Sequence, residues 1–375
     1  MKKLFSFLMV FAMAMSLLTG CGLSGGSATP AQDKRDSAAL DTLPENPTLE
    51  QINAFVTAPS SNPDKVVIKY TNQASDMTNQ SYQRGNLMFL KALKEELGDK
   101  VQIEIYLNGT LGNSTEAIIG GLQSGTFQMT DYSLGSYASY TNAFQPLDIP
   151  YLVKNADDAF ALLNGEAGEI MGAKLEADTG IMPIFYNLIG MRQLTNSKHV
   201  VDSPDDLASL KLRTQSNSVQ MTGMSAFGCA ITNIAFTELF TSLQQGVVDA
   251  QENPLETIYA YQYYDVQDYL TVTNHLCGAS AVLCNRTWYD SLSDEFKAAI
   301  DKAAAYAVQY SQEDFNASEA AVLDELKAVM TVTELTDDQV AEFQTVAKTK
   351  WPELAKEIGE DYVNEVLTAA GLSME

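Results

Sequence analysis

Strand-like and helix-like segments alternate along the first third of the chain. A β-branched run at 65–71 precedes 81–97, where leucines recur at helical spacing, and 101–107 alternates like a strand. Another helix pattern at 114–124 leads into a strand pattern at 127–130. This β-α-β-α-β order predicts a largely parallel sheet covered by helices. Sheets of that kind bind ligands at the carboxyl ends of their strands.

The alternation continues before the chain becomes helical. Strands are predicted at 181–188, 210–213 and 272–284, and helices at 156–177, 204–207, 218–227, 237–245 and 255–264. From Ser293 to the end the pattern is helical. With 375 residues, 46% of them hydrophobic, the chain is long enough for two domains or one large one.

The N-terminus has the pattern of a targeting signal. Two lysines precede an apolar stretch at 4–18, which is short for a membrane span but suits a signal peptide. The stretch ends in Leu-Thr-Gly followed by Cys21, which resembles a bacterial lipobox. We expect a signal peptide at 1–20, cleavage before Cys21, and a lipid on its thiol. An ordinary signal peptide with an incidental cysteine is the alternative.

The segment that follows, 21–63, is rich in Gly, Ser, Ala, Pro and Asp and has little periodicity. It predicts a flexible tether between the lipid and the folded part. A short helix at 48–56 fits within it, and an ordered extension is the alternative interpretation.

Charge and histidine content exclude some functions. Lys plus Arg is 23 and Asp plus Glu is 48, so the net charge of -25 disfavours nucleic-acid binding. The chain has two histidines, His199 and His275, which argues against a histidine-rich metal site. We expect no metal and no cofactor, although calcium sites made of carboxylates alone stay open.

Three cysteines follow the one at the lipobox: Cys229, Cys277 and Cys284. An odd number outside the cytoplasm leaves at least one unpaired. Which of them pair, if any, is left open; a bond between Cys229 and Cys277 is one possibility.

Catalytic motifs are lacking in the sequence. It has no Gly-x-Ser-x-Gly elbow, no phosphate-binding loop and no dinucleotide fingerprint. His275 is expected to be structural. An enzyme would need a base beside a nucleophile, and the sequence offers no such pair.

Two arginines stand in apolar surroundings at predicted strand ends. Arg213 ends the run Leu-Lys-Leu-Arg, and Arg192 follows Ile-Gly-Met. A guanidinium matches a carboxylate through two parallel hydrogen bonds, so these residues are candidates for binding an anion. The plainer interpretation is a surface salt bridge in a protein rich in acids.

A family resemblance rests on several motifs. The run KLRTQSNSVQMTGMSAFGCAITNIAFTELFTSLQQGVVDAQENP covers 211–254, and Asp-Ile-Pro-Tyr at 148–151 and Gly-Leu-Gln-Ser-Gly at 121–125 agree with it. These resemble the substrate-binding protein of a tripartite ATP-independent periplasmic (TRAP) transporter, in the C4-dicarboxylate and sialic-acid receptor family. The resemblance extends from residue 65 to the C-terminus.

The resemblance implies a fold and its boundaries. It implies an α/β, periplasmic-binding-protein-like clamp of two domains with mixed, mostly parallel sheets, flanking helices and a ligand cleft between the domains. Domain I would comprise 64–189 plus 279–318, and domain II would comprise 190–278 plus 319–375.

The resemblance also implies ligand-binding residues. Arg213 matches the arginine that pairs with the ligand carboxylate, Arg192 a second arginine, Asn253 an amide donor, and Phe236 a ring lining the pocket. The first domain would supply specificity groups, for which the candidates are Asn72, Glu116, Asp131 and Ser133.

The sequence departs from the family after Arg213. Thr214-Gln215-Ser216 stands where relatives usually have Val-Pro, so the ligand identity stays open among C4-dicarboxylates, uronates, sialic acid and keto acids.

The expected function is an extracytoplasmic receptor that captures an organic acid anion and delivers it to a TRAP permease. The receptor would be held on the outer face of the cell membrane by its lipid and would perform no covalent chemistry. Two alternatives are a ligand-sensing lipoprotein that feeds a signalling partner and an extracytoplasmic enzyme acting on an anion.

Overall fold

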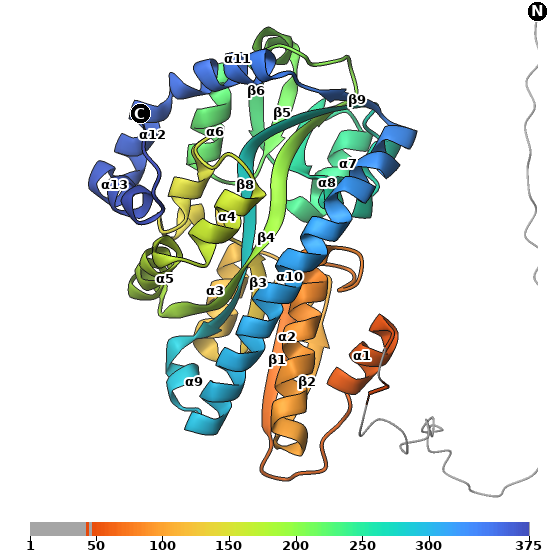
Figure 1. The fold of residues 1–375 in the computed structure, drawn as a ribbon, viewed down its shortest axis with the longest axis vertical. Helices are drawn as coiled ribbons and strands as arrows, with labels where there is room; N and C mark the ends of the chain where they lie inside the picture. Colours follow the sequence, from red (N-terminus) through yellow and green to blue (C-terminus); the bar gives the residue numbers. More distant parts are fainter. Residues whose placement is uncertain (1–42, 45–46, 375) are drawn as a thin grey trace, which may run out of the picture. The chain divides into compact units, whose positions relative to one another are not determined.

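The computed structural model describes residues 43–44 and 47–374, which belong to a compact unit that begins at Leu40 (Figure 1). The predicted signal peptide at 1–20, the lipidation site Cys21 and the first half of the predicted tether lie outside the described residues. No helix in the described part of the chain is long and apolar enough to cross a membrane.

In the described part of the chain, one mixed sheet of nine strands organises the fold. One end is a parallel set made by β1 (Val66–Asn72), β2 (Val101–Tyr106) and β3 (Met129–Ser133). The other end is a second parallel set made by β5 (Lys211–Thr214), β6 (Ala230–Asn233) and β7 (Ala250–Pro254). Each set, with its helices, forms one of two lobes, called here the β1 lobe and the β5 lobe.

Two long antiparallel strands join the lobes. They are β4 (Ile181–Asn196) and β8 (Tyr269–Asn285), which stand side by side in the sheet order β2-β1-β3-β8-β4-β7-β5-β6 (Figure 1). Their pairing shifts register at three places, one of them just before Gly190, which pairs with Gly278. Such irregularities bend a strand and increase its twist, so the sheet turns where the chain passes between the lobes.

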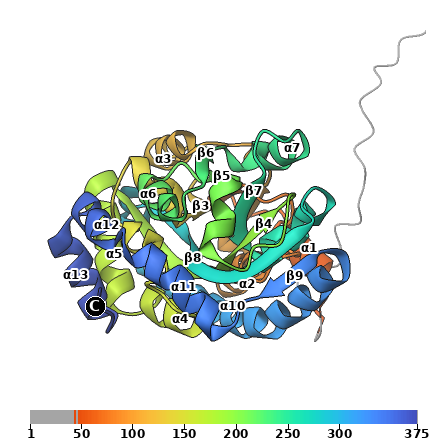
Figure 2. The same ribbon diagram turned by 90° about the horizontal axis from the view of Figure 1, so that it is seen from above.

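Helices cover the sheet. Seen from above, α10 and α11 lie on one side of β4 and β8, and β5, β6 and α7 lie on the other (Figure 2). The bounds of the helices are α1 (Leu49–Val56), α2 (Ser81–Leu97), α3 (Thr115–Ser124), α4 (Ala156–Leu163), α5 (Glu166–Thr179), α6 (Ser218–Met224), α7 (Leu239–Gln244), α8 (Leu255–Ala260), α9 (Arg286–Asp290), α10 (Asp294–Val329), α11 (Asp337–Lys348), α12 (Trp351–Ile358) and α13 (Glu360–Ala369).

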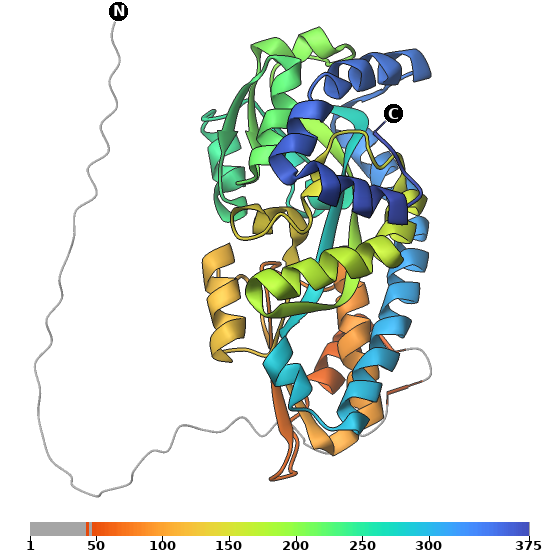
Figure 3. The same cartoon turned by 90° about the vertical axis from the view of Figure 1, so that its left-hand side faces the viewer.

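The helix α10 runs beside the long strands and contacts both lobes (Figure 3). Its 36 residues span about 54 Å at 1.5 Å per residue. It begins at Ser293, whose side chain accepts a hydrogen bond from the Phe296 amide. Along the β1 lobe it packs tightly on α2, where Gly85 leaves space for Ser311; a Cβ on Gly85 would lie 2.9 Å from the Ser311 Cβ.

Most predicted elements are confirmed, and two predictions are wrong. The helix expected at 156–177 is two helices, because the chain turns at Gly165, where α4 has ended and α5 begins. The all-helical C-terminus is interrupted by β9 (Thr331–Glu334), a run of alternating β-branched residues that pairs with β8.

Within the predicted tether, the short helix is present as α1. Thr48 caps it, and Ile52, Phe55 and Val56 are buried in the core that α2 also enters. This part of 21–63 is therefore ordered and belongs to the β1 lobe.

The three cysteines of the described chain are free thiols. All three are buried, in separate hydrophobic clusters. Burial raises the pKa of Cys229 to about 11 and the pKa values of Cys277 and Cys284 to about 12. The disulfide bond between Cys229 and Cys277 that the sequence left open is absent.

Candidate ligand-binding site

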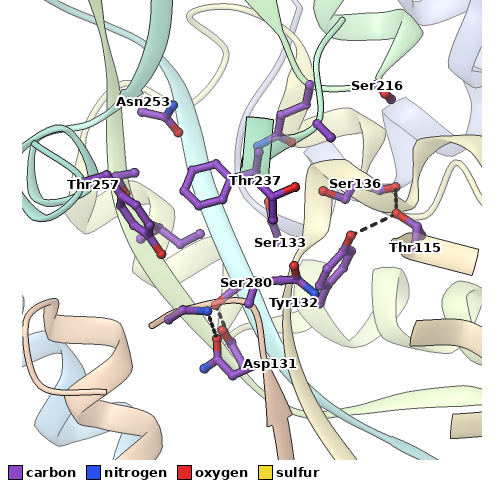
Figure 4. A pocket seen from close by; sticks show the side chains of 18 of the residues that line it. Thr115, Asp131, Tyr132, Ser133, Ser136, Ser216, Thr237, Asn253, Thr257 and Ser280 are labelled. Atoms are coloured by element: carbon purple, nitrogen blue, oxygen red, sulfur yellow. Dashed lines mark hydrogen bonds between the residues drawn. The ribbon is translucent and has the colours of Figure 1, made fainter. Parts of the chain in front are cut away.

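A cavity of about 250 Å³ lies where the strand ends of the two lobes face each other. The β1 lobe contributes the carboxyl ends of β1 and β3, and the β5 lobe contributes those of β5 and β7. This position agrees with the expectation that a sheet of this kind binds its ligand at the carboxyl ends of its strands. Figure 4 shows side chains of both lobes pointing into this space.

The side chain of Arg213 is the most unusual group in the wall. It is only 1% exposed, and its Nε and Nη2 donate to the Ile234 carbonyl at 3.0 and 2.7 Å. Its Nη1 is buried and has no protein partner, and none of the ion pairs among the described residues includes Arg213. Burial lowers the pKa of this guanidinium to about 10, so it stays charged at neutral pH. Part of its donor fork is free for a ligand.

The second arginine of the wall is already paired. Arg192 donates to both carboxylate oxygens of Glu252, and its Nη2 also reaches the Asn253 Oδ1 at 3.2 Å. Burial alone would raise the pKa of Glu252, but the Arg192 charge and a His275 contact lower it well below the usual range. The pair is therefore ionised and close to neutral as a unit. Asn253 is fixed between Arg192 and Gln251, whose Oε1 accepts from its Nδ2.

The wall formed by the β1 lobe contains a buried carboxyl group. Asp131, on β3, is 4% exposed and accepts a hydrogen bond from the Ser280 hydroxyl at 2.7 Å and a longer one from Gln83 at 3.4 Å. Burial raises its pKa to about 7, against smaller opposing effects of these hydrogen bonds. Asn72, at the end of β1, holds Gln83 through its Nδ2 and accepts from the Ala74 amide, so it fixes this corner.

Hydroxyl groups line the side of the cavity beside that carboxyl. The Tyr132 hydroxyl lies 3.3 Å from the Thr115 Oγ1, which donates to the Ser136 carbonyl at 3.1 Å (Figure 4). On the β5 lobe, the ring of Phe236 packs edge-on against Tyr261, with centroids 4.8 Å apart. The cavity thus combines one free cationic donor, one carboxyl, many hydroxyls and an aromatic wall.

Seven of the eight residues predicted from the sequence line this cavity. They are Arg213, Arg192, Asn253, Phe236, Asn72, Asp131 and Ser133. Glu116 does not; it is exposed in the first turn of α3, while its neighbours Ser114 and Thr115 face the cavity. The helix period explains the difference, since adjacent residues point about 100° apart. Gln215 and Ser216, which closely follow Arg213 in the chain, also line the cavity.

Other lining residues were missed by the sequence interpretation. Ser280 lies in the middle of β8 and reaches the site because β8 pairs with β3 in antiparallel register. Thr257 comes from α8 and Ser136 from the turn after β3. No local motif marks these positions, because only the non-local pairing of strands brings them to the cavity.

Within residues 43–44 and 47–374, no group of three or more His, Cys, Asp or Glu side chains is arranged to hold a metal ion. A small anion with hydrogen-bonding groups matches the free Arg213 donor and the polar wall.

Known proteins share this sequence and fold. A profile of the bacterial extracellular solute-binding proteins, family 7 (DctP), matches residues 73–357. The chain is 28% identical over 309 residues to the C4-dicarboxylate-binding periplasmic protein DctP of Rhodobacter capsulatus, covering 82% of this chain and 91% of that protein.

Two solved structures superpose closely. The sugar acid binding protein DctPAm from Advenella mimigardefordensis, in complex with galactonate, is 30% identical with a TM-score of 0.77, covering 83% of this chain and 99% of that one. A TRAP periplasmic solute binding protein from Polaromonas sp. JS666, bound to D-erythronate, is 27% identical with a TM-score of 0.75, covering 83% and 100%. The two-domain clamp and the family resemblance inferred from the sequence are confirmed, and the chain belongs to family 7 of the bacterial extracellular solute-binding proteins.

Proposed function

We propose that this protein is a receptor that binds a carboxylate-bearing organic acid between its lobes and hands it to a TRAP permease. The observation that carries the proposal is the free Nη1 of the buried Arg213. A buried cation with an unused donor is costly unless an anion pairs with it. The relatives bound to galactonate and to D-erythronate, and the relative named as C4-dicarboxylate-binding, all take carboxylates, which supports the same ligand class here.

Binding would change the balance between open and closed forms. Ligand contacts come from both lobes, so a bound acid stabilises the closed arrangement more than an open one. We place the domain boundaries at 189/190 and 278/279, where Gly190 pairs with Gly278, and at 318/319, within α10. The permease would then recognise the closed form.

The membrane anchor is a further part of the proposal. The apolar stretch and the lipobox-like sequence before Cys21 support a lipoprotein held on the extracytoplasmic face. Metabolic labelling with a radioactive fatty acid tests it: wild type should carry the label, and Cys21→Ser should not.

The ligand class is tested by titration calorimetry of the purified chain. The acids would be C4-dicarboxylates, aldonates, uronates, keto acids and amino acids. We expect at least one acid class to bind, and Arg213→Ala to weaken that binding about 100-fold, since hydrogen bonds to charged groups contribute about 1.5–3 kcal/mol each.

The matched control is Arg286→Ala, which removes an arginine that pairs with Glu176 outside the cavity and should leave affinity unchanged. Circular dichroism would check that both variants are folded. Binding by Arg213→Ala as tight as wild type would exclude Arg213 as the carboxylate site, and a wild-type protein that binds no acid would contradict the receptor function.

A further inference from the structure

The cavity has positively charged residues at one end and a carboxyl group at the other. Among the described residues that line it, the basic ones are Arg192 and Arg213, and the acidic one is Asp131. Arg192 is neutralised by Glu252, so Arg213 alone offers an unpaired positive charge. One ligand carboxylate satisfies it. A second carboxylate would need another cation, and the lining residues supply none.

The Asp131 carboxyl lies away from the arginine end. Figure 4 shows Asp131 and Ser280 at one end of the pocket and Asn253 and Ser216 at the other. Asn253 accepts from Arg192, so it marks the cationic end. The ion pairs of the described residues do not join Asp131 to either arginine. A ligand that puts one carboxylate on Arg213 therefore extends toward Asp131.

The end around Asp131 suits hydroxyl groups. A ligand hydroxyl carries one proton, which it can donate to a carboxylate or a hydroxyl oxygen. Here the acceptors would be Asp131 and the oxygens of Ser280 and Tyr132, whose own protons are donated to Asp131 and to Thr115. Hydrogen bonds to an ionised carboxylate are about twice as strong as neutral ones, so each ligand hydroxyl placed there strengthens binding.

A second ligand carboxylate would be disfavoured at the same place. Two carboxylates that share a buried site cannot both be ionised without strong repulsion, so one must take up a proton. At pH 8 the pH lies above the Asp131 pKa of about 7, so this carboxyl is mainly ionised and would repel a second ligand carboxylate. The wall thus discriminates between a terminal hydroxymethyl group and a terminal carboxylate.

We propose that the ligand is a polyhydroxy monocarboxylate of the aldonate type, and that Asp131 selects it by binding its hydroxyls and rejecting a second carboxylate. This inference rests on the proposed receptor function. It gives Asp131 the role of a specificity-determining residue, while Arg213 binds the carboxylate that all candidate ligands share.

The test compares acids that differ only at the far carbon. Titration calorimetry at pH 8 would use galactonate against galactarate, and D-erythronate against meso-tartrate. In wild type we expect the monocarboxylate of at least one pair to bind 100-fold or more tightly than its diacid. In Asp131→Asn this ratio should fall at least tenfold, chiefly because the diacid binds more tightly.

Two further variants separate charge from structure. Ser280→Ala removes a hydroxyl but keeps the Asp131 charge, so it should weaken monocarboxylate binding and still reject the diacid; it also serves if Asp131→Asn fails to fold. Glu116→Gln removes a carboxyl outside the cavity and should leave the ratio unchanged.

The outcomes separate this inference from the receptor function. If the diacids bind wild type as tightly as their monocarboxylates, the inference is overturned and the receptor function still stands. The same holds if only acids without hydroxyl groups bind. An unchanged ratio in Asp131→Asn removes the role of Asp131. Failure of every acid to bind wild type contradicts the receptor function itself.

Discussion

Two arginines of one cavity have opposite roles because of their immediate partners. Arg192 lies against Glu252, and Arg213 lies against a carbonyl group only. Arg192 and Glu252 together form a neutral pair, and Arg192 also positions Asn253. Arg213 is buried and keeps its full positive charge. The sequence put both at predicted strand ends, but it did not identify Glu252 as the partner, because 48 acidic residues offer too many candidates.

The buried carboxyl of Asp148, whose pKa is raised, should make stability fall as pH rises. Asp148 accepts hydrogen bonds from Asn217 and Gln220, yet burial raises its pKa to about 6. An unfolded aspartate has a pKa of about 3.9, so between about pH 4 and 6 the folded state binds the proton more strongly. The stability linked to Asp148 is therefore present below pH 4 and lost as pH rises through 6.

This contribution can be measured with urea. We expect the free energy of unfolding of Asp148→Asn to change less between pH 5 and pH 8 than that of wild type, by an amount on the order of 1–2 kcal/mol. Asp205→Asn, on the exposed 3₁₀ turn before β5, is the control and should keep the wild-type pH dependence. Equal pH dependence in Asp148→Asn and wild type would contradict the raised pKa.

At the scale of elements, one helix is capped by a residue of the other lobe. The start of α2 lacks a cap from its own N-cap residue. Instead Glu256, on α8, accepts from the Ser81 amide at 2.8 Å and from its hydroxyl at 2.7 Å, and also from Ser318 at 2.6 Å. A carboxylate is favourable at a helix N-terminus, so this contact stabilises α2 while it joins the two lobes.

We expect Glu256→Ala to lower both stability and ligand affinity, because it removes a contact between the two lobes that together line the cavity. The loss of stability should be about 1–2 kcal/mol, as for other helix caps. The control is Thr336→Ala, which removes the cap of α11 within one lobe and should lower stability alone. Chemical denaturation and calorimetry with a bound acid would measure the two quantities. An unchanged affinity in Glu256→Ala would mean that this contact does not couple the lobes.

A helix or strand could be predicted from the sequence where neighbouring residues alone determine it. The helix at 81–97 was predicted with its observed ends, because its leucine spacing and the following Gly98 are local signals. The split at Gly165 was missed, since the glycine interrupts an otherwise helical pattern. The strand β9 was missed because four residues carry little pattern of their own, and pairing with β8 decides their conformation.

On the scale of the whole molecule, the two lobes meet through a pair of glycines. Gly190 has φ 137°, which residues with a Cβ rarely adopt, and a Cβ there would lie 3.0 Å from the Pro254 Cβ. A Cβ on Gly278 would lie 3.0 Å from the Gly190 carbonyl oxygen and 3.1 Å from the Pro254 Cγ. Pro254 also lines the cavity, so the crossing of the long strands lies directly beside the ligand site.

Gly190→Ala should therefore be destabilising, by about 1–3 kcal/mol for the strained backbone. The matched control is Gly120→Ala on α3, where an added Cβ meets no atom within 4 Å. There alanine should stabilise the helix by roughly 0.5–1 kcal/mol. Thermal unfolding of both variants checks the opposite signs. A neutral Gly190→Ala would show that the crossing relaxes at little cost.

The arrangement of the lobes was predictable from the sequence only through the family resemblance. Local patterns indicated a parallel sheet in the first third of the chain and a similar alternation after it, but not that β4 and β8 join two sets of strands into one sheet. Strands so far apart in the chain pair through contacts that no window of sequence contains. The same holds for the cavity: its arginines follow local apolar runs, whereas Ser280 and Thr257 enter it by tertiary packing.

The three buried thiols can report on local unfolding, because each becomes reactive only when the region around it opens. Cys284 lies in the core of α2 and β1, Cys229 in a core of the β5 lobe, and Cys277 in the cluster around β4 and β8. A thiol reacts only as an exposed thiolate, so a labelling reagent reaches each one only when its surroundings unfold. The three labelling rates would thus time the unfolding of three regions without an engineered probe, and a bound acid should slow the rate at Cys277.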